Sequence, residues 1–287
     1  MTVFEHPLNE RIRSFMRLQQ LFERLDHHLN GLSRIDLHAS IGVLLEAYEL
    51  TSRNNLKTEA IKELERQKQA FQPPLSAQSS TDEAHDEEAA DDGDKPAADK
   101  DEDEDEDAAA DAEEAALQAR LTLENITALR NALHAQPPRS SHHLQNNDFL
   151  NSVRQRCGIN GSGSTYDLPL YHFWLDRDVI DCRNTIIEWM EPYKQLREAI
   201  NLILDNIRHQ ARFETIVAER GFYQNSLKSD RTPQLVRVHI PEKADIYPEI
   251  SAGIHRITIR FMQYNSANEK PVQNLDDITF EIATCAI

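Results

Sequence analysis

The spacing of apolar residues changes once along this chain of 287 residues, at Gly221. Before Gly221, apolar residues recur every three or four positions, which is typical of helices with one buried stripe. The first such stripe is Ile12, Phe15, Leu18, Phe22, Leu25 and Leu29. After Gly221 the period becomes two, which is typical of strands with one buried face. The alternating apolar positions are Val236, Val238 and Ile240, then Ile257, Ile259 and Phe261, then Ile278, Phe280 and Ile282.

This change of period predicts an α+β fold. We expect a mostly helical domain over residues 7–219 and a small antiparallel β-sheet domain over residues 220–287, with one face of the sheet buried. Residues 2–6 are short and rich in strand-forming types, and are a candidate for an added strand that would tie the two ends of the chain together.

The expected helices follow the same apolar spacing. After a first helix capped by Asn9, we expect helices at about 35–50, 56–71, 121–133, 147–156 and 178–189. Pro192 suits the first turn of a last, long helix that runs to about Glu219. Within this last helix a heptad-like seam is a candidate dimer interface, or else part of the core; its members are Tyr193, Leu196, Ile200, Ile203 and Ile207.

Acidic residues are concentrated in one segment. Residues 82–114 hold 19 Asp or Glu and two Lys, a net charge of −17, and the rest of the chain carries a net charge of −1. The consecutive carboxylates of residues 101–107 repel one another, and the segment offers little apolar surface to offset the entropy lost on ordering. We therefore predict a disordered acidic insertion over residues 75–118, with helix at its Ala-rich end near Ala108–Leu117.

Cysteine usage and the N-terminus indicate the compartment. Cys157, Cys182 and Cys285 are far apart and odd in number, which predicts reduced thiols and a reducing environment. The N-terminus has no secretory signal, and no apolar run reaches the roughly 20 residues of a membrane helix. We expect a cytoplasmic protein with no membrane partner.

The apparent catalytic motifs are weak. The Gly158–Gly163 loop lacks the Lys of a phosphate-binding loop. Ser164, Asp167 and His172 are triad residue types without a nucleophile elbow, and the paired histidines have no third zinc ligand in view. We therefore expect no enzymatic activity, no cofactor and no metal site.

Three blocks of sequence, in this order, resemble the ZapD family. They are Phe4-Glu-His-Pro-Leu-Asn-Glu-Arg-Ile-Arg-Ser-Phe-Met-Arg17, Asp167-Leu-Pro-Leu-Tyr-His-Phe-Trp-Leu175, and Gly221-Phe-Tyr-Gln with Ile246-Tyr-Pro-Glu-Ile-Ser-Ala-Gly-Ile-His-Arg-Ile-Thr-Ile-Arg-Phe-Met262. The resemblance runs from about Val3 to Cys285, apart from the acidic insertion. It implies a non-enzymatic protein of the mid-cell division ring that binds the tubulin-like protein FtsZ, by its C-terminal tail, and bundles FtsZ filaments. Bundling by one small protein requires two partner sites per particle, and a homodimer is the simplest way to obtain them.

The candidate partner-binding residues are basic. Helical spacing places Arg13, Arg17, Gln20 and Arg24 on one stripe, which by pattern alone is an ordinary solvated face. The resemblance implies that Arg17 and Arg13 bind the tail of FtsZ, and guanidinium groups suit this because they grip carboxylates with two hydrogen bonds.

The second set lies in the predicted sheet. Its outward face shows Arg237, His239, Arg256 and Arg260, opposed only by Glu281, and the resemblance points to the Arg256–Arg260 strand as a second partner-binding element. His172, amid aromatic residues, is a packed histidine by pattern and a partner-binding residue by resemblance. The alternative function is a nucleic-acid-binding module that uses the basic sheet face, although this face lacks aromatic residues for base stacking.

Overall fold

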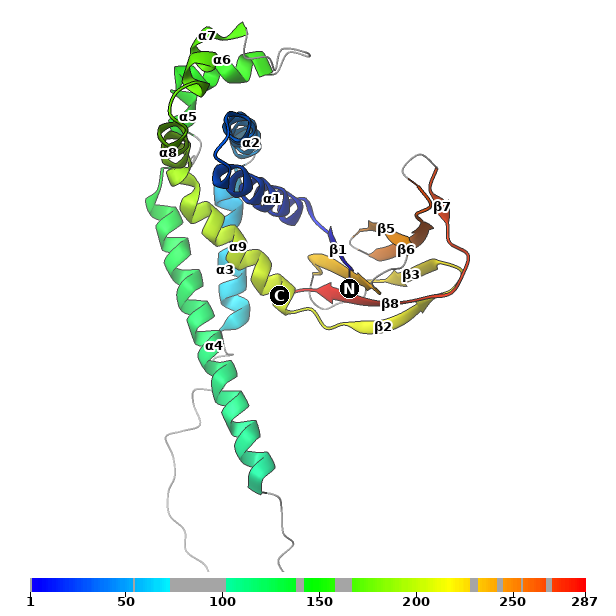
Figure 1. The fold of residues 1–287 in the computed structure, drawn as a ribbon. Coiled ribbons are helices and arrows are strands. Elements are labelled where there is room, and N and C mark those ends of the chain that lie inside the picture. The colour runs from blue at the N-terminus through cyan, green and yellow to red at the C-terminus, as the bar shows by residue number, and fades with distance from the viewer. Residues whose placement is uncertain are drawn as a thin grey trace, which may run out of the picture.

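The computed structural model describes residues 2–53, 55–72, 102–137, 142–157, 167–227, 232–241, 245–253, 255–266 and 270–287. Its helices are α1 (Glu10–Asn30), α2 (Arg34–Arg53), α3 (Leu56–Phe71), α4 (Glu102–Ala135), α5 (His142–Gln145), α6 (Asp148–Cys157), α7 (Pro169–Leu175), α8 (Val179–Met190), the 3₁₀ helix η3 (Glu191–Tyr193) and α9 (Lys194–His209). Its strands are β1 (Thr2–Pro7), β2 (Glu214–Ala218), β3 (Phe222–Ser226), β4 (Leu235–Ile240), β5 (Ile246–Ala252), β6 (Arg256–Gln263), β7 (Val272–Gln273) and β8 (Ile278–Cys285). The α+β fold is confirmed (Figure 1).

The helices pack around α1 and α9. The side chain of Asn9 accepts a hydrogen bond from the Ile12 N–H and so caps α1, which buries its apolar stripe against α2, α3 and α9. Each buried Leu or Phe of such a stripe contributes about 1.5–3 kcal/mol through the hydrophobic effect. The seam of residues 193–207 is part of this core, because its five members are at most 1% exposed. It is therefore not available as a dimer interface.

Helix α4 runs alongside α3 and α9 and extends well beyond them (Figure 1). It begins at Glu102, and the helix expected near Ala108–Leu117 falls within it. Residues 73–101, where the rest of the expected disorder falls, lie outside the described residues.

The last helix is shorter than expected. Helix α9 ends at His209 rather than near Glu219, and residues 214–218 form β2. The β-branched run Thr215-Ile216-Val217 favours an extended backbone, and β2 pairs with β8. Strand pairing thus begins before Gly221, the residue at which the apolar spacing changes.

The strands form two antiparallel sheets instead of the single sheet expected. Sheet A has the order β1-β4-β8-β2, and sheet B has the order β3-β6-β5, with β7 also pairing with β6. The alternating apolar residues of both sheets share one core, in which the rings of Phe261 and Phe280 lie 4.9 Å apart. The sheets are therefore a sandwich with two outward faces. The added strand at the N-terminus is confirmed, because β1 pairs with β4.

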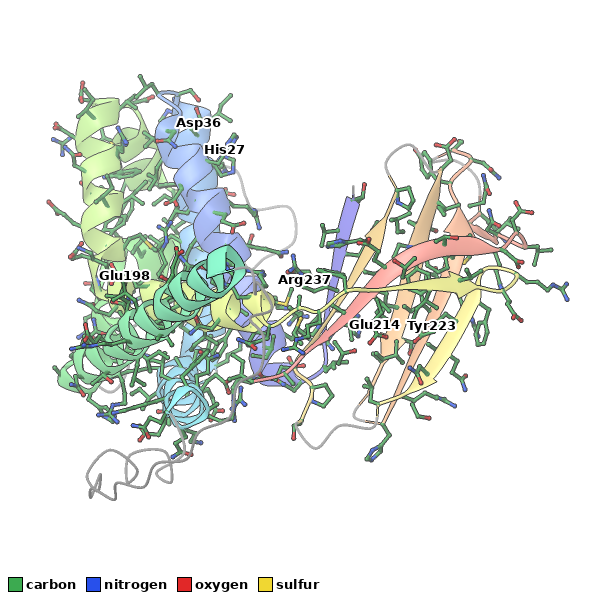
Figure 2. The ribbon with its side chains drawn as sticks, turned by 90° about the horizontal axis from the view of Figure 1, so that it is seen from below. His27, Asp36, Glu198, Glu214, Tyr223 and Arg237 are labelled. Carbon is green, nitrogen blue, oxygen red and sulfur yellow. The ribbon has the colours of Figure 1, made fainter. Side chains whose placement is uncertain are left out.

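Two ionic clusters connect the helices to the β-sandwich. In the first, Glu5 of β1 bonds both Arg208 of α9, at 2.9 Å, and Arg237 of β4, at 3.1 Å; Figure 2 shows Arg237 where the sandwich meets the helices. In the second, the buried carboxylate of Glu63 accepts hydrogen bonds from Arg11, at 2.9 Å, and from the Gln234 side chain, at 2.8 Å.

Candidate partner-binding surfaces

The basic stripe of α1 lies on the outer side of the helix, with Arg17, Gln20 and Arg24 exposed and Arg13 half-buried. Arg13 pairs with Glu10 at 3.2 Å, and Arg24 pairs with Glu46 at 3.1 Å. Arg17 lies between them, and among the described residues its exposed guanidinium makes no ion pair or side-chain hydrogen bond. Arg17 is therefore the member of the stripe whose charge is best placed to meet carboxylates of another molecule.

Arg13 also acts on the neighbouring strand. Burial lowers the pKa of His6 in β1, and the positive charge of Arg13 lowers that pKa further. At neutral pH the His6 ring is therefore uncharged, and the positive charge at this end of α1 comes from the arginines.

Arg256 and Arg260 lie on the outer face of sheet B. Both are exposed and line one shallow depression of about 450 Å³ together with side chains of β3 and β5. The register places Arg260 between Phe222 and Glu249. In the described part of the chain neither arginine has a carboxylate within ion-pair distance, although Glu249 lines the same depression, so two positive charges and one negative charge share this concave surface.

The other two basic residues of the predicted face are not on this surface. Arg237 and His239 belong to β4, so they lie on the outer face of sheet A. Arg237 pairs with Glu5, and the ring of His239 stacks on Phe213 at 3.8 Å and contacts Glu281 at 3.2 Å. The expectation of one shared basic face was wrong because a sandwich has two outward faces. Arg237 joins the sheet to α9 through Glu5, whereas His239 packs within sheet A and against the segment between α9 and β2.

His172 lies in a polar cluster between α7 and α2. Arg34 donates to His172 Nδ1 at 2.9 Å, and His172 Nε2 lies 3.3 Å from Asp176. Because arginine has only donors, Nδ1 must accept and the ring proton on Nε2 faces Asp176. Arg34 also bonds Asp176. The ring is half-exposed, with its nitrogens engaged in attaching α7 to α2.

The predicted residues do not converge on one site. Arg13 and Arg17 lie on α1, His172 lies on α7 at the end of the helical part, and Arg256 and Arg260 lie on β6 in the sandwich (Figure 1). Sequence spacing predicts exposure along one element, but it carries no information on distances between elements. The structure therefore presents separate surfaces rather than a single cleft.

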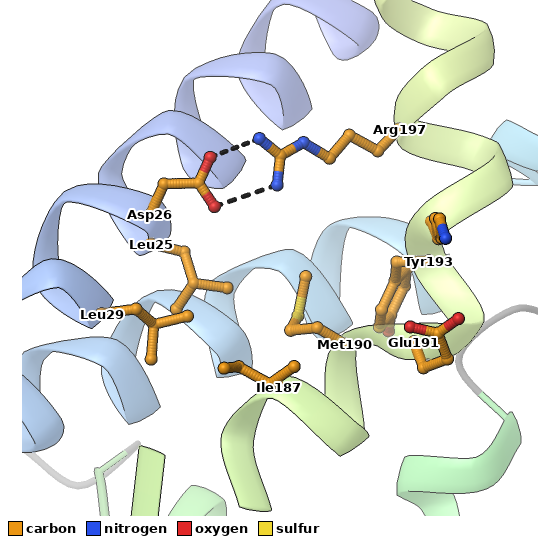
Figure 3. Close-up of a pocket in the computed structure, with 9 residues that line it drawn as sticks. Leu25, Asp26, Leu29, Ile187, Met190, Glu191, Tyr193 and Arg197 are labelled. Carbon is orange, nitrogen blue, oxygen red and sulfur yellow. Dashed lines mark hydrogen bonds and ion pairs between the residues drawn. The ribbon is translucent and has the colours of Figure 1, made fainter. Parts of the chain in front are cut away.

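One pocket was not predicted from the sequence. It lies between α1, α8, η3 and α9 and has a volume of about 180 Å³ (Figure 3). Leu25, Leu29, Ile187 and Met190 form its apolar wall, and a bidentate ion pair between Arg197 and Asp26 lies at its rim. This volume is below the roughly 300–1,000 Å³ of typical small-molecule sites. The helical periodicity of Leu25 and Leu29 was the available signal, and it indicated core.

Within the described residues, no group of His, Cys, Asp and Glu side chains has the arrangement of a metal site. No helix in those same ranges combines the length and the apolar character that crossing a membrane requires.

The chain is similar along its length to proteins of one kind. A family model described as "ZapD: Cell division protein" matches residues 16–97 and 104–260. A cell division protein ZapD of Methylococcus capsulatus is 33% identical over 285 residues, which cover 99% of this chain and 98% of the relative. Relatives with the same description from Azoarcus sp. strain BH72 (30% identical, all of both chains) and Cupriavidus metallidurans (32% identical, 99% of both chains) match equally fully.

Proposed function

This chain belongs to the ZapD family of cell division proteins, and from this premise we propose that it binds FtsZ and crosslinks FtsZ filaments at the mid-cell division ring. The full-length similarity to curated members of the family carries the proposal. The protein acts in the cytoplasm by binding rather than by catalysis, and it requires no cofactor.

We assign partner binding to Arg13, Arg17, His172, Arg256 and Arg260. The exposed guanidinium of Arg17 supports this assignment, because Arg17 has no carboxylate partner among the residues that the structure describes. It can therefore bind a carboxylate of the FtsZ tail without first breaking one of those ion pairs. Arg256 and Arg260 offer the same property on sheet B. His172 contributes through its exposed ring edge, with its orientation held by Arg34.

Crosslinking by a homodimer would double these sites and separate them in space. Because the 193–207 seam is core, the dimer must use another surface. Leu170 and Phe173 of α7 and Ile180 of α8 are 59–67% exposed, which favours this end of the helical part as the contact between two copies. Light scattering of a Phe173→Ser, Ile180→Ser variant tests this, since a dimer that persists would exclude the surface.

The nucleic-acid alternative has less support. It depended on four basic residues on one sheet face, and two of these, Arg237 and His239, instead lie on the other sheet, where each contacts a carboxylate. The remaining pair, Arg256 and Arg260, offers few phosphate contacts for a stable complex.

The test is co-pelleting of purified FtsZ with GTP, with and without this protein. Arg17→Glu should abolish bundling and leave the circular dichroism spectrum and melting temperature nearly unchanged, because exposed substitutions usually change stability by no more than about 0.5 kcal/mol. Arg53→Glu is the matched control, because Arg53 is 77% exposed on α2 and away from the stripe. A folded Arg17→Glu protein that bundles filaments as the wild type does would remove Arg17 from the site.

A further inference from the structure

Strand β3 forms an open edge of sheet B. The strand order β3-β6-β5 places β3 at one end, and no strand in the described part of the chain pairs with its outer side. Its sequence, Phe-Tyr-Gln-Asn-Ser, has no proline and no charge, and four of its five residues are exposed. Natural proteins usually protect such edges with charged residues or proline, because an open edge can pair with another chain.

The opposite edge of the same sheet is protected. Gly253 donates to the Arg256 carbonyl at 3.0 Å, and Tyr264 donates to the Asp245 carbonyl at 2.7 Å. Bonding alternates along an antiparallel pair, so the nitrogen of Pro248 in β5 faces away from β6. A proline at such a position removes no ladder bond and blocks further pairing. Only the β3 edge of sheet B is thus open for strand addition among the described strands.

The hydrogen-bond register identifies which backbone groups of β3 are free. Phe261 donates to the Gly221 carbonyl at 2.8 Å, and Leu227 donates to the His255 carbonyl at 2.9 Å. Because antiparallel bonding alternates, Tyr223 and Asn225 bond to β6, while Gln224 and Ser226 direct their N–H and C=O groups outward. Figure 2 shows Tyr223 on the side of the sandwich away from the helices.

Phe222 and Gln224 of β3 also line the basic depression, and Ser226 lies beside it in the register. The register pairs Phe222 with Arg260 and Ser226 with Arg256, and all four side chains lie on the outer face of sheet B. Added strands lie about 4.8 Å apart, so a carboxylate opposite Ser226 would be about 10 Å from the Arg256 backbone. The small Ser226 side chain leaves room for an Arg and a Glu side chain to span this distance. Phe222, at the other end, would contact an apolar side chain.

We propose that an extended acidic segment of the partner protein adds to the free edge of β3 as a further strand of sheet B. Backbone bonds to Gln224 and Ser226 hold the segment, as in other cases of strand addition. A carboxylate beside Ser226 meets Arg256, and an apolar residue four positions away on the same face packs on Phe222. This mode rests on the proposed function, because it describes how the Arg256–Arg260 surface takes the acidic partner.

A peptide-binding experiment on the full chain tests the backbone part of the proposal. The probe is a short blocked peptide in which Glu alternates with Thr, except that a Val replaces the Glu four positions from one of the other Glu residues. Its binding is measured by isothermal titration calorimetry. Gln224→Pro removes the outward N–H and blocks the edge without removing a ladder bond, so we expect binding to weaken by about tenfold or more, which corresponds to at least 1.4 kcal/mol. Gln224→Ala, which removes only the side chain, should bind within about twofold of wild type. Arg256→Glu should also weaken binding.

A second measurement does not depend on the folding of any variant. Two N-methylated versions of the peptide, one methylated on the Val and every Glu and one on every Thr, are titrated into the wild-type protein. Strand addition requires that one alternate set of N–H groups faces β3, so one version should lose binding and the other should retain it. Equal binding of both would overturn the proposal in favour of charge attraction alone, and failure of the unmodified peptide to bind would also overturn it.

Two further readouts separate the possible failures. If Gln224→Pro converts a dimer to a monomer in light scattering, the edge belongs to a second copy of this chain and the proposal is wrong. Co-pelleting with FtsZ is measured on the same samples. Absence of co-pelleting by the wild-type protein would contradict the proposed function, whereas co-pelleting that Gln224→Pro leaves unchanged would contradict strand addition alone.

Discussion

Glu63 is the residue at which a single substitution should most clearly loosen the connection between the helices and the β-sandwich. Its carboxylate is 0% exposed. It accepts hydrogen bonds from Arg11 of α1, from Arg66 in its own helix, and from the side chain of Gln234 next to β4. Arg66 also donates to the carbonyl of Ile287 at the end of the chain. Glu63→Gln would keep the shape of the side chain and remove its charge, which leaves Arg66 facing a neutral amide and Arg11 with Glu59, 2.8 Å away, as its remaining counter-ion.

The expected loss of stability is about 3 kcal/mol. Removing one partner of a buried ion pair costs about 3–5 kcal/mol. The lower end applies here, because the side chains of Arg11 and Arg66 are each 35% exposed and can be partly hydrated when the carboxylate is lost. For a chain of this size, each kcal/mol lowers the melting temperature by about 2–4 °C, so we expect a decrease of about 6–12 °C.

The pH dependence of this difference is a sharper test. Burial alone would raise the pKa of Glu63, but hydrogen bonds from Arg66, Gln234 and Arg11 together with the Arg66 charge outweigh it, so the pKa lies below its usual value. A depressed folded-state pKa means that the carboxylate stabilises the fold fully above the unfolded pKa of about 4.3. This stabilisation is lost as the pH falls through the lower, folded-state pKa. Wild type and Glu63→Gln should therefore differ fully at pH 5–7, and the difference should shrink progressively as the pH falls below the unfolded pKa of about 4.3.

Urea unfolding followed by circular dichroism, at several pH values from 7 down to 3, measures this difference. Glu46→Gln is the control, because the Glu46–Arg24 pair is more than half exposed on both sides and its loss should change stability little. If Glu63→Gln is as stable as wild type at pH 7, the carboxylate does not stabilise the connection. A difference that stays constant below pH 4 would refute the depressed pKa.

Three more outcomes are expected. Binding to FtsZ should weaken steeply between 0.1 and 1 M salt in a sedimentation assay, because the electrostatic screening length falls from about 10 Å to about 3 Å. An affinity that does not vary with salt would indicate an apolar binding mode instead. Replacing residues 78–101 with an uncharged Gly-Ser linker of equal length tests the hypothesis that the acidic segment competes with FtsZ for the basic surfaces around Arg17 and Arg256 at high effective concentration. Competition predicts that the replacement tightens FtsZ binding at low salt only, and equal affinities at low salt would refute it. Burial raises the pKa of Cys285 to about 11 and also raises that of Cys182. Peptide mapping after treatment with a thiol reagent at pH 8 should therefore find both cysteines unmodified until the protein unfolds. Rapid modification of either cysteine in the native protein would contradict this.

The exposure of the candidate site residues could be predicted, but their arrangement could not. Helical spacing correctly placed Arg17 on the solvent side of α1, and alternation correctly placed Arg256 and Arg260 opposite the buried Ile257 and Ile259. The division into two domains and the roles of these residues in partner binding remain predictions. The involvement of Arg237 in the connection to the helices depends on Glu5, a residue more than two hundred positions away, and no local pattern records such a contact.

The sequence by itself determined which side of each element is buried, because side chains repeat every 3.6 residues in a helix and every two in a strand. The α+β fold, the strand at the N-terminus and the buried faces of β4, β6 and β8 follow from this rule. Only the tertiary structure decided which buried faces meet. Alternation is identical in a single sheet and in a sandwich, so the separation of Arg237 from Arg256 arises from pairing between distant strands. For the same reason the 193–207 seam could be either interface or core, and packing against α1 and α3 made it core.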